Sequence, residues 1–288
     1  MLPLLRPLAL FAAVVTATAS CTRQPPATAD HVFESIPVPN PSLFSTQLAD
    51  IDGAPAEWLM EDREGLAVVE GDIVLGTVAE FTSPGLAIKS LQYLRARLWT
   101  KGVVPYVLPP DFPNRSTVLA AMEDFHRTTP IKFVARSTEP DYLVFTLTDN
   151  PAIGGQSYYG RQGGPQPLWL NRNTTRWNKG VAIHELCHAL TVAHEQSRAD
   201  RDRFVRIERQ NIMPGYAANF DPLLSDGRDV GDYDYASIMH YPRNAFGLRG
   251  RTTIVPLQRG ATIGQREGLS ERDIAGLIAI YAAELAKP

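Results

Sequence analysis

Cysteine is scarce in this sequence, with only Cys21 and Cys187 among 288 residues. A framework of several disulfides, on which many small secreted domains depend, is therefore excluded. Charge of one sign is also lacking, because the net charge is −3 and no block of like charges occurs. A nucleic-acid partner is accordingly not expected. With 44% hydrophobic residues, the chain can form one sizeable core.

The first twenty residues have the pattern of a secretory signal peptide. Met1–Arg6 carries one positive charge, Leu8–Val15 is apolar but too short to cross a bilayer, and small residues follow. Two cleavage sites remain open. Ala17-Thr18-Ala19 fits an ordinary A-x-A site, whereas Thr18-Ala19-Ser20-Cys21 resembles a bacterial lipobox, with Thr18 where Leu is usual. We expect residues 1–20 to direct export, to the cell envelope as a lipoprotein or to the periplasm or medium. A lipid on Cys21 would be the one membrane contact.

Residues 21–90 are expected to form a linker and a propeptide-like segment. Residues 22–60 are rich in Pro, Ala, Ser and Asp with little periodicity, which is typical of a linker. From residue 98 onward apolar patches are dense. They predict strands at 103–107, 131–134, 141–147 and 154–160, the last at a sheet edge, and helices at 116–127, 177–190 and 271–286. Strands and helices mix without strict alternation, which favours an α+β fold.

The segment His184-Glu185-Leu186-Cys187-His188 carries the clearest chemistry. Histidines four residues apart lie on one face of a helix, one turn apart, and can bind one metal ion. Glu185 follows the first of them, so it can flank the metal without binding it and act as a general base on water. Imidazole ligands and hydrolytic chemistry favour a single catalytic Zn²⁺ ion.

A third histidine, His194, follows His188 by six residues, too far for the same helical face. We therefore expect the helix to end near 190–191 and the chain to turn sharply, so that His194 completes the site. The whole motif resembles the metzincin signature, which has Gly where this chain has Thr191. Such a turn favours a positive φ, so either Thr191 is strained by roughly 1–3 kcal/mol or the turn is built differently. Cys187 should point away from the metal, into the core.

Other segments resemble the astacin family of zinc metalloendopeptidases. Residues 233–242, with Ser-Ile-Met-His-Tyr at their centre, are similar to the family's Met-turn, and residues 98–106, 195–202 and 263–270 are similar to further family segments. The resemblance covers about residues 95–285 and identifies a bacterial exported member. It implies a metzincin-like catalytic domain over 91–288. Its upper subdomain, about 91–194, would hold a mixed twisted sheet with the active-site helix above. Its lower subdomain, about 195–288, would be mostly irregular with a C-terminal helix.

The resemblance also implies roles for single residues. Tyr241 would be an additional zinc ligand through its phenol oxygen and would swing off the metal to stabilise an oxyanion. Met239 would lie beneath the three imidazoles. Glu195 would contact the buried N-terminus of the processed enzyme, and Arg198 would anchor the segment after the site. For these last two, a plain surface ion pair is the alternative.

Val69-Glu70-Gly71-Asp72 resembles the family's propeptide motif F-x-G-D, with Val69 in place of the aromatic residue. The resemblance implies that Asp72 binds the zinc and displaces the catalytic water, which would make the chain a zymogen. The alternative is an ordinary turn, in which Gly-Asp is common. Activation would need a cut between Asp72 and Leu98, where no processing site is clear.

The expected function is therefore zinc-dependent hydrolysis of internal peptide bonds in protein or peptide substrates by a monomer. His184, His188 and His194 would hold the zinc, Glu185 would be the general base, and Tyr241 would stabilise the transition state. Two alternatives remain: a zinc-containing module that binds peptides without cleaving them, and a hydrolase of peptidoglycan cross-links. Glu185 and Tyr241 argue against the first, because a pure binder needs no base.

Overall fold

The computed structural model describes residues 41–49, 55–83, 98–151, 153–173, 178–221 and 229–287. All of these belong to one unit, residues 31–288. The predicted signal peptide at 1–20 and Cys21 lie outside the described residues. Among the helices of the described ranges, none is both long and apolar enough to cross a membrane.

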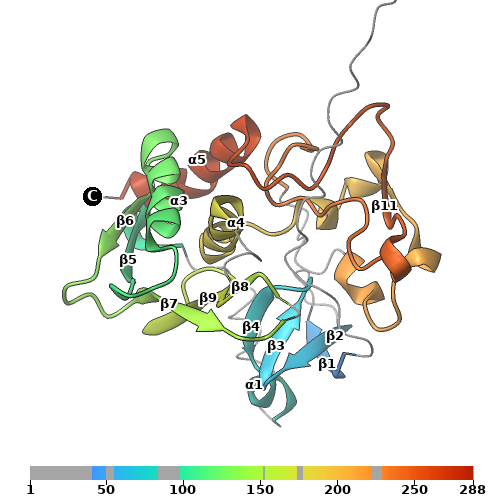
Figure 1. Cartoon of the computed structure of the whole chain (residues 1–288), viewed down its shortest axis with the longest axis horizontal. Helices are drawn as coiled ribbons and strands as arrows, with labels where there is room; N and C mark the ends of the chain where they lie inside the picture. The colour runs from blue at the N-terminus through green and yellow to red at the C-terminus, as the bar shows by residue number, and fades with distance from the viewer. Residues whose placement is uncertain are drawn as a thin grey trace, which may run out of the picture. The chain divides into compact units, whose positions relative to one another are not determined.

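A nine-stranded mixed sheet forms the frame of this unit, in the order β1-β2-β3-β4-β8-β9-β7-β5-β6 (Figure 1). The strands are β1 (Leu43–Ala49), β2 (Pro55–Arg63), β3 (Leu66–Val69), β4 (Ile73–Thr77), β5 (Val103–Val107), β6 (Lys132–Ala135), β7 (Tyr142–Thr148), β8 (Gly155–Tyr158) and β9 (Pro165–Asn171). Strands β6, β5, β7 and β9 are parallel, and β8 is antiparallel to β9. The strands predicted at 103–107, 131–134 and 141–147 are confirmed.

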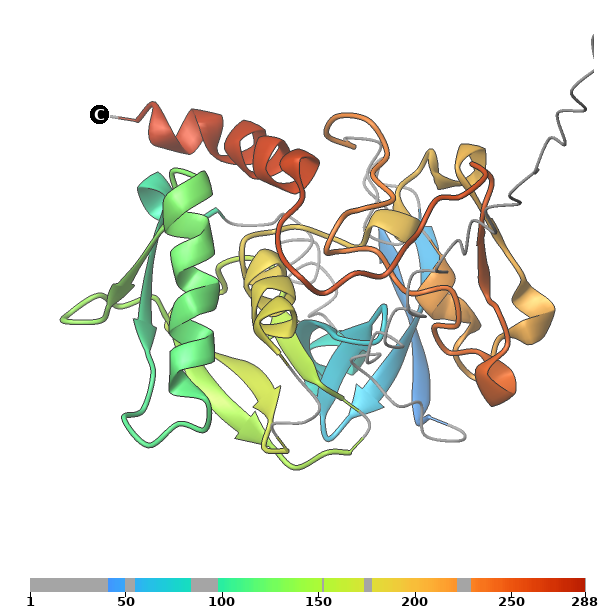
Figure 2. The same ribbon diagram turned by 45° about the horizontal axis from the view of Figure 1, so that its top comes forward.

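Helices α3 (Arg115–Thr128) and α4 (Lys179–Ala189) pack against each other and against the β5–β9 half of the sheet (Figure 2). Helix α5 (Glu271–Leu285) joins the same core through Leu277 and Tyr281. Trp99 connects these elements, because its indole donates to the Ala189 carbonyl at 2.8 Å and its amide donates to the Tyr281 hydroxyl at 3.4 Å. The three predicted helices are confirmed. Trp99 links the end of α4 to α5 near the C-terminus.

The segment between α4 and α5 has little regular structure in its described residues. It contains short 3₁₀ helices and one two-stranded sheet, β10 (Val205–Ile207) with β11 (Ile254–Pro256). A second core, in which half of the side chains are aromatic, holds it together: Val205, Ile212, Tyr216, Phe220, Tyr233, Tyr241, Ala245, Phe246, Ile254 and Ile263. This core places Tyr241 and Phe246 beside Gly71, in the turn between β3 and β4.

The linker predicted over 22–60 is wrong for residues 43–49 and 55–60, which lie in β1 and β2. In β2, Trp58 and Met60 are buried while Glu57 and Leu59 are exposed. Among the residues of β2 whose burial is described, Trp58 and Met60 are the only buried apolar side chains, and the partner strand β3 follows later in the chain, so a local window shows too little periodicity. We call the described residues 41–49 and 55–83 the N-terminal meander. With α1 (Val78–Thr82), it has a small core of Trp58, Met60, Ala67, Val69, Ile73, Leu75 and Phe81.

The predicted edge strand at 154–160 is also wrong in one respect, because β8 is an interior strand. Strand β4 pairs with its outer side in parallel, with Ile73 opposite Ser157 and Val74 opposite Tyr158. Ser157 N–H donates to the Asp72 carbonyl at 3.1 Å, and Tyr159 N–H donates to the Val74 carbonyl at 3.3 Å. The N-terminal meander thus supplies a strand that the sequence pattern of β8 alone did not reveal.

Candidate metal centre

Helix α4 and the turn after it position all three histidines. The Asn178 side chain caps the helix by accepting from Val181 N–H at 3.2 Å. At its C-terminal end, Val192 N–H donates to the Cys187 carbonyl at 3.0 Å and Thr191 N–H to the His188 carbonyl at 2.9 Å. This is a Schellman motif, and its C′ residue, Thr191, has φ 73°. Of the two expectations for this turn, the strained Thr191 is the one found.

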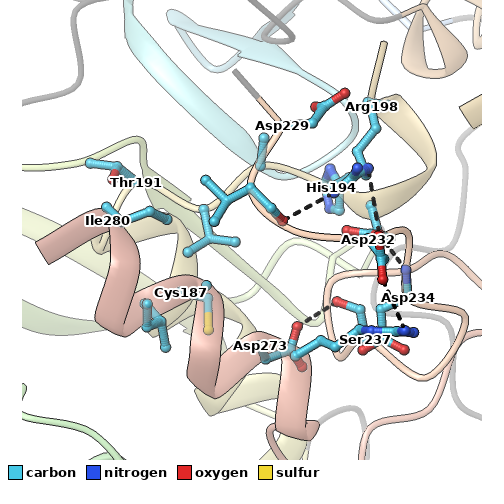
Figure 3. Close-up of a pocket in the computed structure, with 18 of the residues that line it drawn as sticks. Cys187, Thr191, His194, Arg198, Asp229, Asp232, Asp234, Ser237, Asp273 and Ile280 are labelled. Atoms are coloured by element: carbon cyan, nitrogen blue, oxygen red, sulfur yellow. Dashed lines mark hydrogen bonds and ion pairs between the residues drawn. The ribbon is translucent and has the colours of Figure 1, made fainter. Parts of the chain in front are cut away.

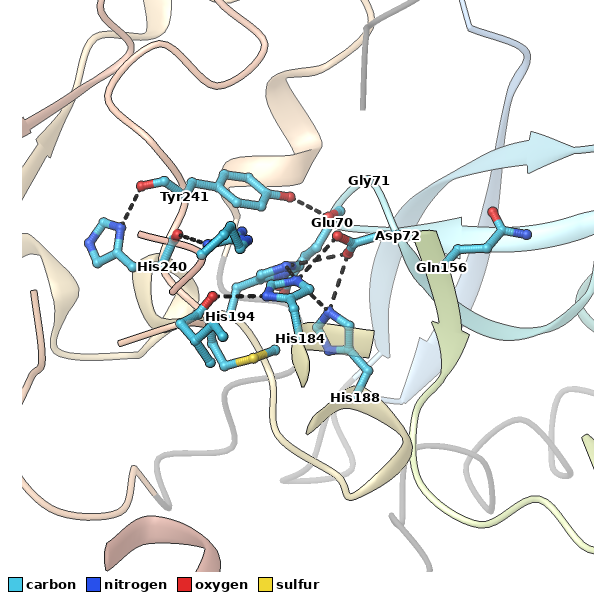
Figure 4. Close-up of polar contacts among 12 residues, drawn as sticks. Glu70, Gly71, Asp72, Gln156, His184, His188, His194, His240 and Tyr241 are labelled. Carbon is cyan, nitrogen blue, oxygen red and sulfur yellow. Dashed lines mark hydrogen bonds and ion pairs between the residues drawn. The ribbon is translucent and has the colours of Figure 1, made fainter. Parts of the chain in front are cut away.

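The ring nitrogens of the three histidines meet at one point, together with Asp72 of the N-terminal meander (Figure 4). His184 Nε2 lies 3.1 Å from His188 Nε2 and 3.2 Å from His194 Nε2. The Asp72 carboxylate oxygens lie 3.4 Å from the Nε2 atoms of His184 and His188 and 3.3 Å from that of His194. All four side chains are buried.

These distances fit a tetrahedral ion. Zinc–ligand bonds of about 2.0–2.1 Å require ligand atoms about 3.3–3.4 Å apart at the vertices of a tetrahedron. The five distances run from 3.1 to 3.4 Å, with Asp72 Oδ2 measured to His184 and Asp72 Oδ1 to His188 and His194. Three imidazole nitrogens and a carboxylate packed this closely need a cation or proton among them, since their lone pairs repel. The donor set of three His and one Asp therefore fits Zn²⁺.

Burial and neighbouring charge act on the titration of the cluster in opposite directions. Burial lowers the pKa of His184 and of His188. Burial also acts to lower the pKa of His194, but the charge of Asp72 and hydrogen bonds with Asp72 and Glu70 outweigh it and raise that pKa to about 9. For Asp72, burial acts to raise the pKa, whereas the charge of His194 and hydrogen bonds from the three imidazoles hold it well below its usual range. Asp72 is thus an anion that the histidine cluster stabilises.

The outer ring nitrogens are fixed as well. Nδ1 of His184 is 2.9 Å from the Ile238 carbonyl oxygen, and Nδ1 of His188 is 2.9 Å from that of Val192. Nδ1 of His194 is 2.8 Å from a carboxylate oxygen of Glu70, two residues before Asp72. With Nε2 turned to the metal, each Nδ1 carries the proton and donates it to these oxygens.

Glu185 lies on the sheet side of the cluster, against β8. It is fully buried, and a Cβ atom added to Gly155 would lie 2.6 Å from its Oε1. Any side chain at Gly155 would therefore displace this carboxylate. Glu185 therefore lies in direct contact with the main chain of β8.

Tyr241 packs beside the third histidine, with its ring centroid 4.6 Å from that of His194. Its hydroxyl donates a hydrogen bond to the main-chain carbonyl of Glu70. Its role as a zinc ligand stays a prediction. Met239 is buried in the main core together with Ile238, and its amide donates to the Ser237 hydroxyl at 3.0 Å.

Glu195 and Arg198 line a cavity of about 160 Å³ behind the cluster (Figure 3). Burial raises the pKa of Glu195 to about 8, against a hydrogen bond from Asp234 N–H at 2.6 Å and the charge of Arg198. Arg198 donates to both oxygens of Asp200 and to the carbonyls of Val230 and Gly231. Since the Arg198 side chain is only 9% exposed, a plain surface ion pair does not describe it.

Three contacts of the site were not identified from the sequence: those of Glu70, Gly155 and Asp273. Asp273, in the first turn of α5, accepts from Ser237 Oγ at 2.6 Å and from Ile238 N–H at 2.9 Å. Each contact joins segments far apart in the chain, so local patterns do not reveal it. A Ser-x-x-Asp capping box at 270–273 was a visible signal for the helix start, but not for the contact with the Met-turn.

Comparison with known proteins agrees with this geometry. The family profile described as Astacin (Peptidase family M12A) matches residues 92–282. Zinc metalloproteinase nas-14 of Caenorhabditis elegans is 35% identical over 264 residues, 87% of this chain but only 51% of nas-14. High choriolytic enzyme 1 of Oryzias latipes is 40% identical over 184 residues, 62% of this chain and 66% of that protein.

A solved structure of high choriolytic enzyme 1, described as a hatching enzyme zinc-protease, has the same fold, with a TM-score of 0.58 at 38% identity. The match covers 65% of this chain and 94% of that one. The match thus covers nearly all of the solved zinc-protease chain, whereas this chain spans about half the length of relatives such as nas-14. From the profile match and these relatives, the chain belongs to the astacin family of peptidases.

Proposed function

We propose that this chain is a zinc-dependent endopeptidase that hydrolyses internal peptide bonds of proteins. One observation carries the proposal: three imidazole Nε2 atoms converge beside the buried Glu185 carboxylate, at the strand where an extended substrate would lie. When bound, a single zinc ion supplies a Lewis acid that activates water and polarises a carbonyl. His184, His188 and His194 would hold it.

The proton transfers fall to Glu185. Its carboxylate takes a proton from the attacking water and delivers it to the leaving amine. Gly155 leaves room for the carboxylate to do so, since no side chain intervenes. Tyr241 would release the Glu70 carbonyl and donate its hydrogen bond to the oxyanion that forms on the scissile carbonyl.

We propose that substrate binds as an extended strand on β8, in a cleft between an upper subdomain of about 91–194 and a lower one of about 195–288. Backbone pairing gives affinity without a fixed sequence, as in other β-augmentation complexes. The support is that β8 already pairs in this way with β4. A protein or peptide is the proposed partner, with the chain acting as a monomer.

The unprocessed chain would be a zymogen. Asp72 lies at 3.3–3.4 Å from all three Nε2 atoms, where it would take the place of the catalytic water. Strand β4 covers the substrate side of β8. We propose that residues 21–90 are a linker and propeptide that must be removed, and that 1–20 directs export, with Cys21 a candidate for lipidation.

After removal, the new N-terminus would enter the cavity lined by Glu195. A buried carboxylate with a raised pKa is suited to an ammonium partner, because the pair removes the cost of a buried lone charge. Arg198 would keep the segment 229–231 in place around that cavity.

Hydrolysis of casein and of a quenched fluorescent peptide by the processed chain tests the activity. We expect cleavage that a chelator abolishes and zinc restores. Glu185→Gln should retain zinc and lose turnover by about 10²–10⁴-fold. An active Glu185→Gln variant would contradict the mechanism. Zinc binding without cleavage would favour the peptide-binding module, and cleavage of peptidoglycan cross-links without casein would favour the alternative hydrolase.

A further inference from the structure

The Nδ1 atoms of the three histidines differ in the kind of acceptor that they face. His184 and His188 donate to main-chain carbonyls, of Ile238 and Val192, that belong to the catalytic part of the chain. His194 instead faces a carboxylate, that of Glu70 at 2.8 Å, which belongs to the N-terminal meander. The third ligand therefore depends on a segment that processing would remove.

Glu70 is built into this position. It is completely buried, with φ 49°, and is followed by Gly71 with φ 81°. A Cβ atom on Gly71 would lie 2.6 Å from the Phe246 ring, so the turn fits tightly against the second core. The Gly71 carbonyl accepts from Arg63 Nη1 at 2.8 Å, and the same nitrogen donates to Gln156 Oε1 on β8 at 3.1 Å.

Burial of a carboxylate is costly unless it is paired and hydrogen-bonded, and the His194 ring is the pairing group shown for Glu70. A carboxylate on the outer nitrogen of a ligating histidine fixes its tautomer and its ring orientation and makes Nε2 more basic. A carbonyl oxygen does this more weakly, because it carries no full charge. Among the three histidines, His194 thus has the strongest hydrogen-bond partner on its outer nitrogen. That partner would be present only while the N-terminal meander remains part of the chain.

We infer that Glu70 is a positioning residue for the metal in the unprocessed chain, and that the N-terminal meander helps to load and retain zinc as well as to block it. This inference rests on the proposed zinc peptidase function. Asp72 would add a fourth donor and Glu70 would hold the third histidine. The N-terminal meander would in this way help to assemble the same metal centre whose activity it blocks.

The test is the zinc affinity of the full-length chain, measured by competition with a chromogenic chelator. Replacing Glu70 by Ala should weaken zinc binding by about 10–100-fold. Glu70→Gln keeps an acceptor oxygen without the charge, so its affinity should lie between those of Glu70→Ala and the wild type. Glu57→Gln, an exposed position on β2, is the matched control and should not change the affinity.

A visible spectrum of the Co²⁺-substituted chain separates positioning from general destabilisation. Loss of Glu70 should alter the d–d bands, whereas a merely less stable fold with an intact centre would not. Wild-type affinity and spectrum in both Glu70 variants would overturn the inference and leave the peptidase proposal intact. If the wild-type full-length chain bound no zinc, the proposed function itself would fail.

Discussion

Thr191 occupies the position at the end of α4 where glycine is usual. At φ 73° a β-branched side chain is strained, and the strain persists because the surrounding turn fixes it. The same turn orients His188 through the Val192 carbonyl and leads directly to His194. The ligands depend on the path of the main chain here, and not on the threonine side chain.

Replacing Thr191 by Gly should therefore stabilise the protein. We expect a gain of about 1 kcal/mol in the free energy of unfolding, since relief of strain exceeds the entropy that glycine adds to the unfolded chain. Urea denaturation at a fixed zinc concentration measures it. Thr117→Gly, within α3, is the matched control and should lower stability. An equal loss in both variants would show that Thr191 is not strained.

Gly155 has a different task, because it gives Glu185 its space. Gly155→Ala would place a methyl group about 2.6 Å from Glu185 Oε1 and push the carboxylate from its place. We expect kcat to fall by about 10²-fold with zinc content unchanged, because a displacement near 1 Å costs that much in a general base. Gly268→Ala, with open space around it, is the control. Wild-type kcat in Gly155→Ala would refute the role.

For single residues, the sequence predicts those site contacts that are made between residues close together in the chain. Three histidines and Glu185 fall within eleven residues, and helical geometry alone brings two of the ligands together. Asp72 was reached only through a family motif. Glu70 could not be found, because its function depends on a turn with two positive φ angles that delivers it to a histidine 124 residues away.

At the scale of elements, the Met-turn and α5 form one structural unit with the metal helix. Asp273 caps α5 by accepting from Ser270 N–H at 2.9 Å and also holds Ser237 and Ile238 of the Met-turn. The Ile238 carbonyl in turn orients His184. The C-terminal helix therefore helps to position His184, through a contact between Asp273 and Ile238 that spans 35 residues.

Removing this carboxylate should affect both stability and metal binding. Asp273→Ala leaves buried donors unpaired and removes a helix cap, so we expect a loss of about 2–3 kcal/mol in unfolding free energy. Asp273→Asn should cost less than half as much, because the Ser237 hydroxyl can reverse its direction to suit the amide. Denaturation and zinc competition together measure this. Equal losses for Ala and Asn would contradict the proposed hydrogen-bond pattern.

The elements differ in how well the sequence foretold them. Strand β7 and helix α5 have periodic patterns of their own, whereas β5 and α4 are marked by compact apolar runs that lie in the core. Strands β1 and β2 have few buried side chains among those described and depend on pairing, β1 with β2 and β2 with β3. The position of β8 inside the sheet is set by a strand some 80 residues earlier, which no local pattern can show.

At the scale of the whole described unit, the N-terminal meander contacts the region from residue 98 onward at several separate places. Strand β4 pairs with β8, Gly71 packs against Phe246, and Pro41 lies against Gly215, where an added Cβ would be 2.7 Å away. In the proposed zymogen, latency would therefore have two physical sources: the Asp72 carboxylate at the metal site, and β4 paired along β8, where substrate is proposed to bind.

Replacing Asp72 alone should thus leave the full-length chain mostly silent. Two main-chain hydrogen bonds of β4 and the Arg63 contact still hold the meander, at about 1 kcal/mol each, which keeps activity about a hundredfold or more below that of the processed enzyme. Peptide hydrolysis by full-length Asp72→Ala measures this, with Asp62→Ala as control. Activity equal to the processed enzyme would assign latency to the metal contact alone.

The pairing of β4 with β8 has a further consequence for the protein after the proposed processing. An unpaired strand exposes a row of free amides and carbonyls, and such rows join other chains edge to edge. In the full-length chain, β4 occupies this side of β8 and so keeps it from pairing with another chain. If the proposed processing removes β4, we expect the exposed edge of β8 to pair with other copies of the protein as well as with substrate, so that self-association would compete with substrate binding.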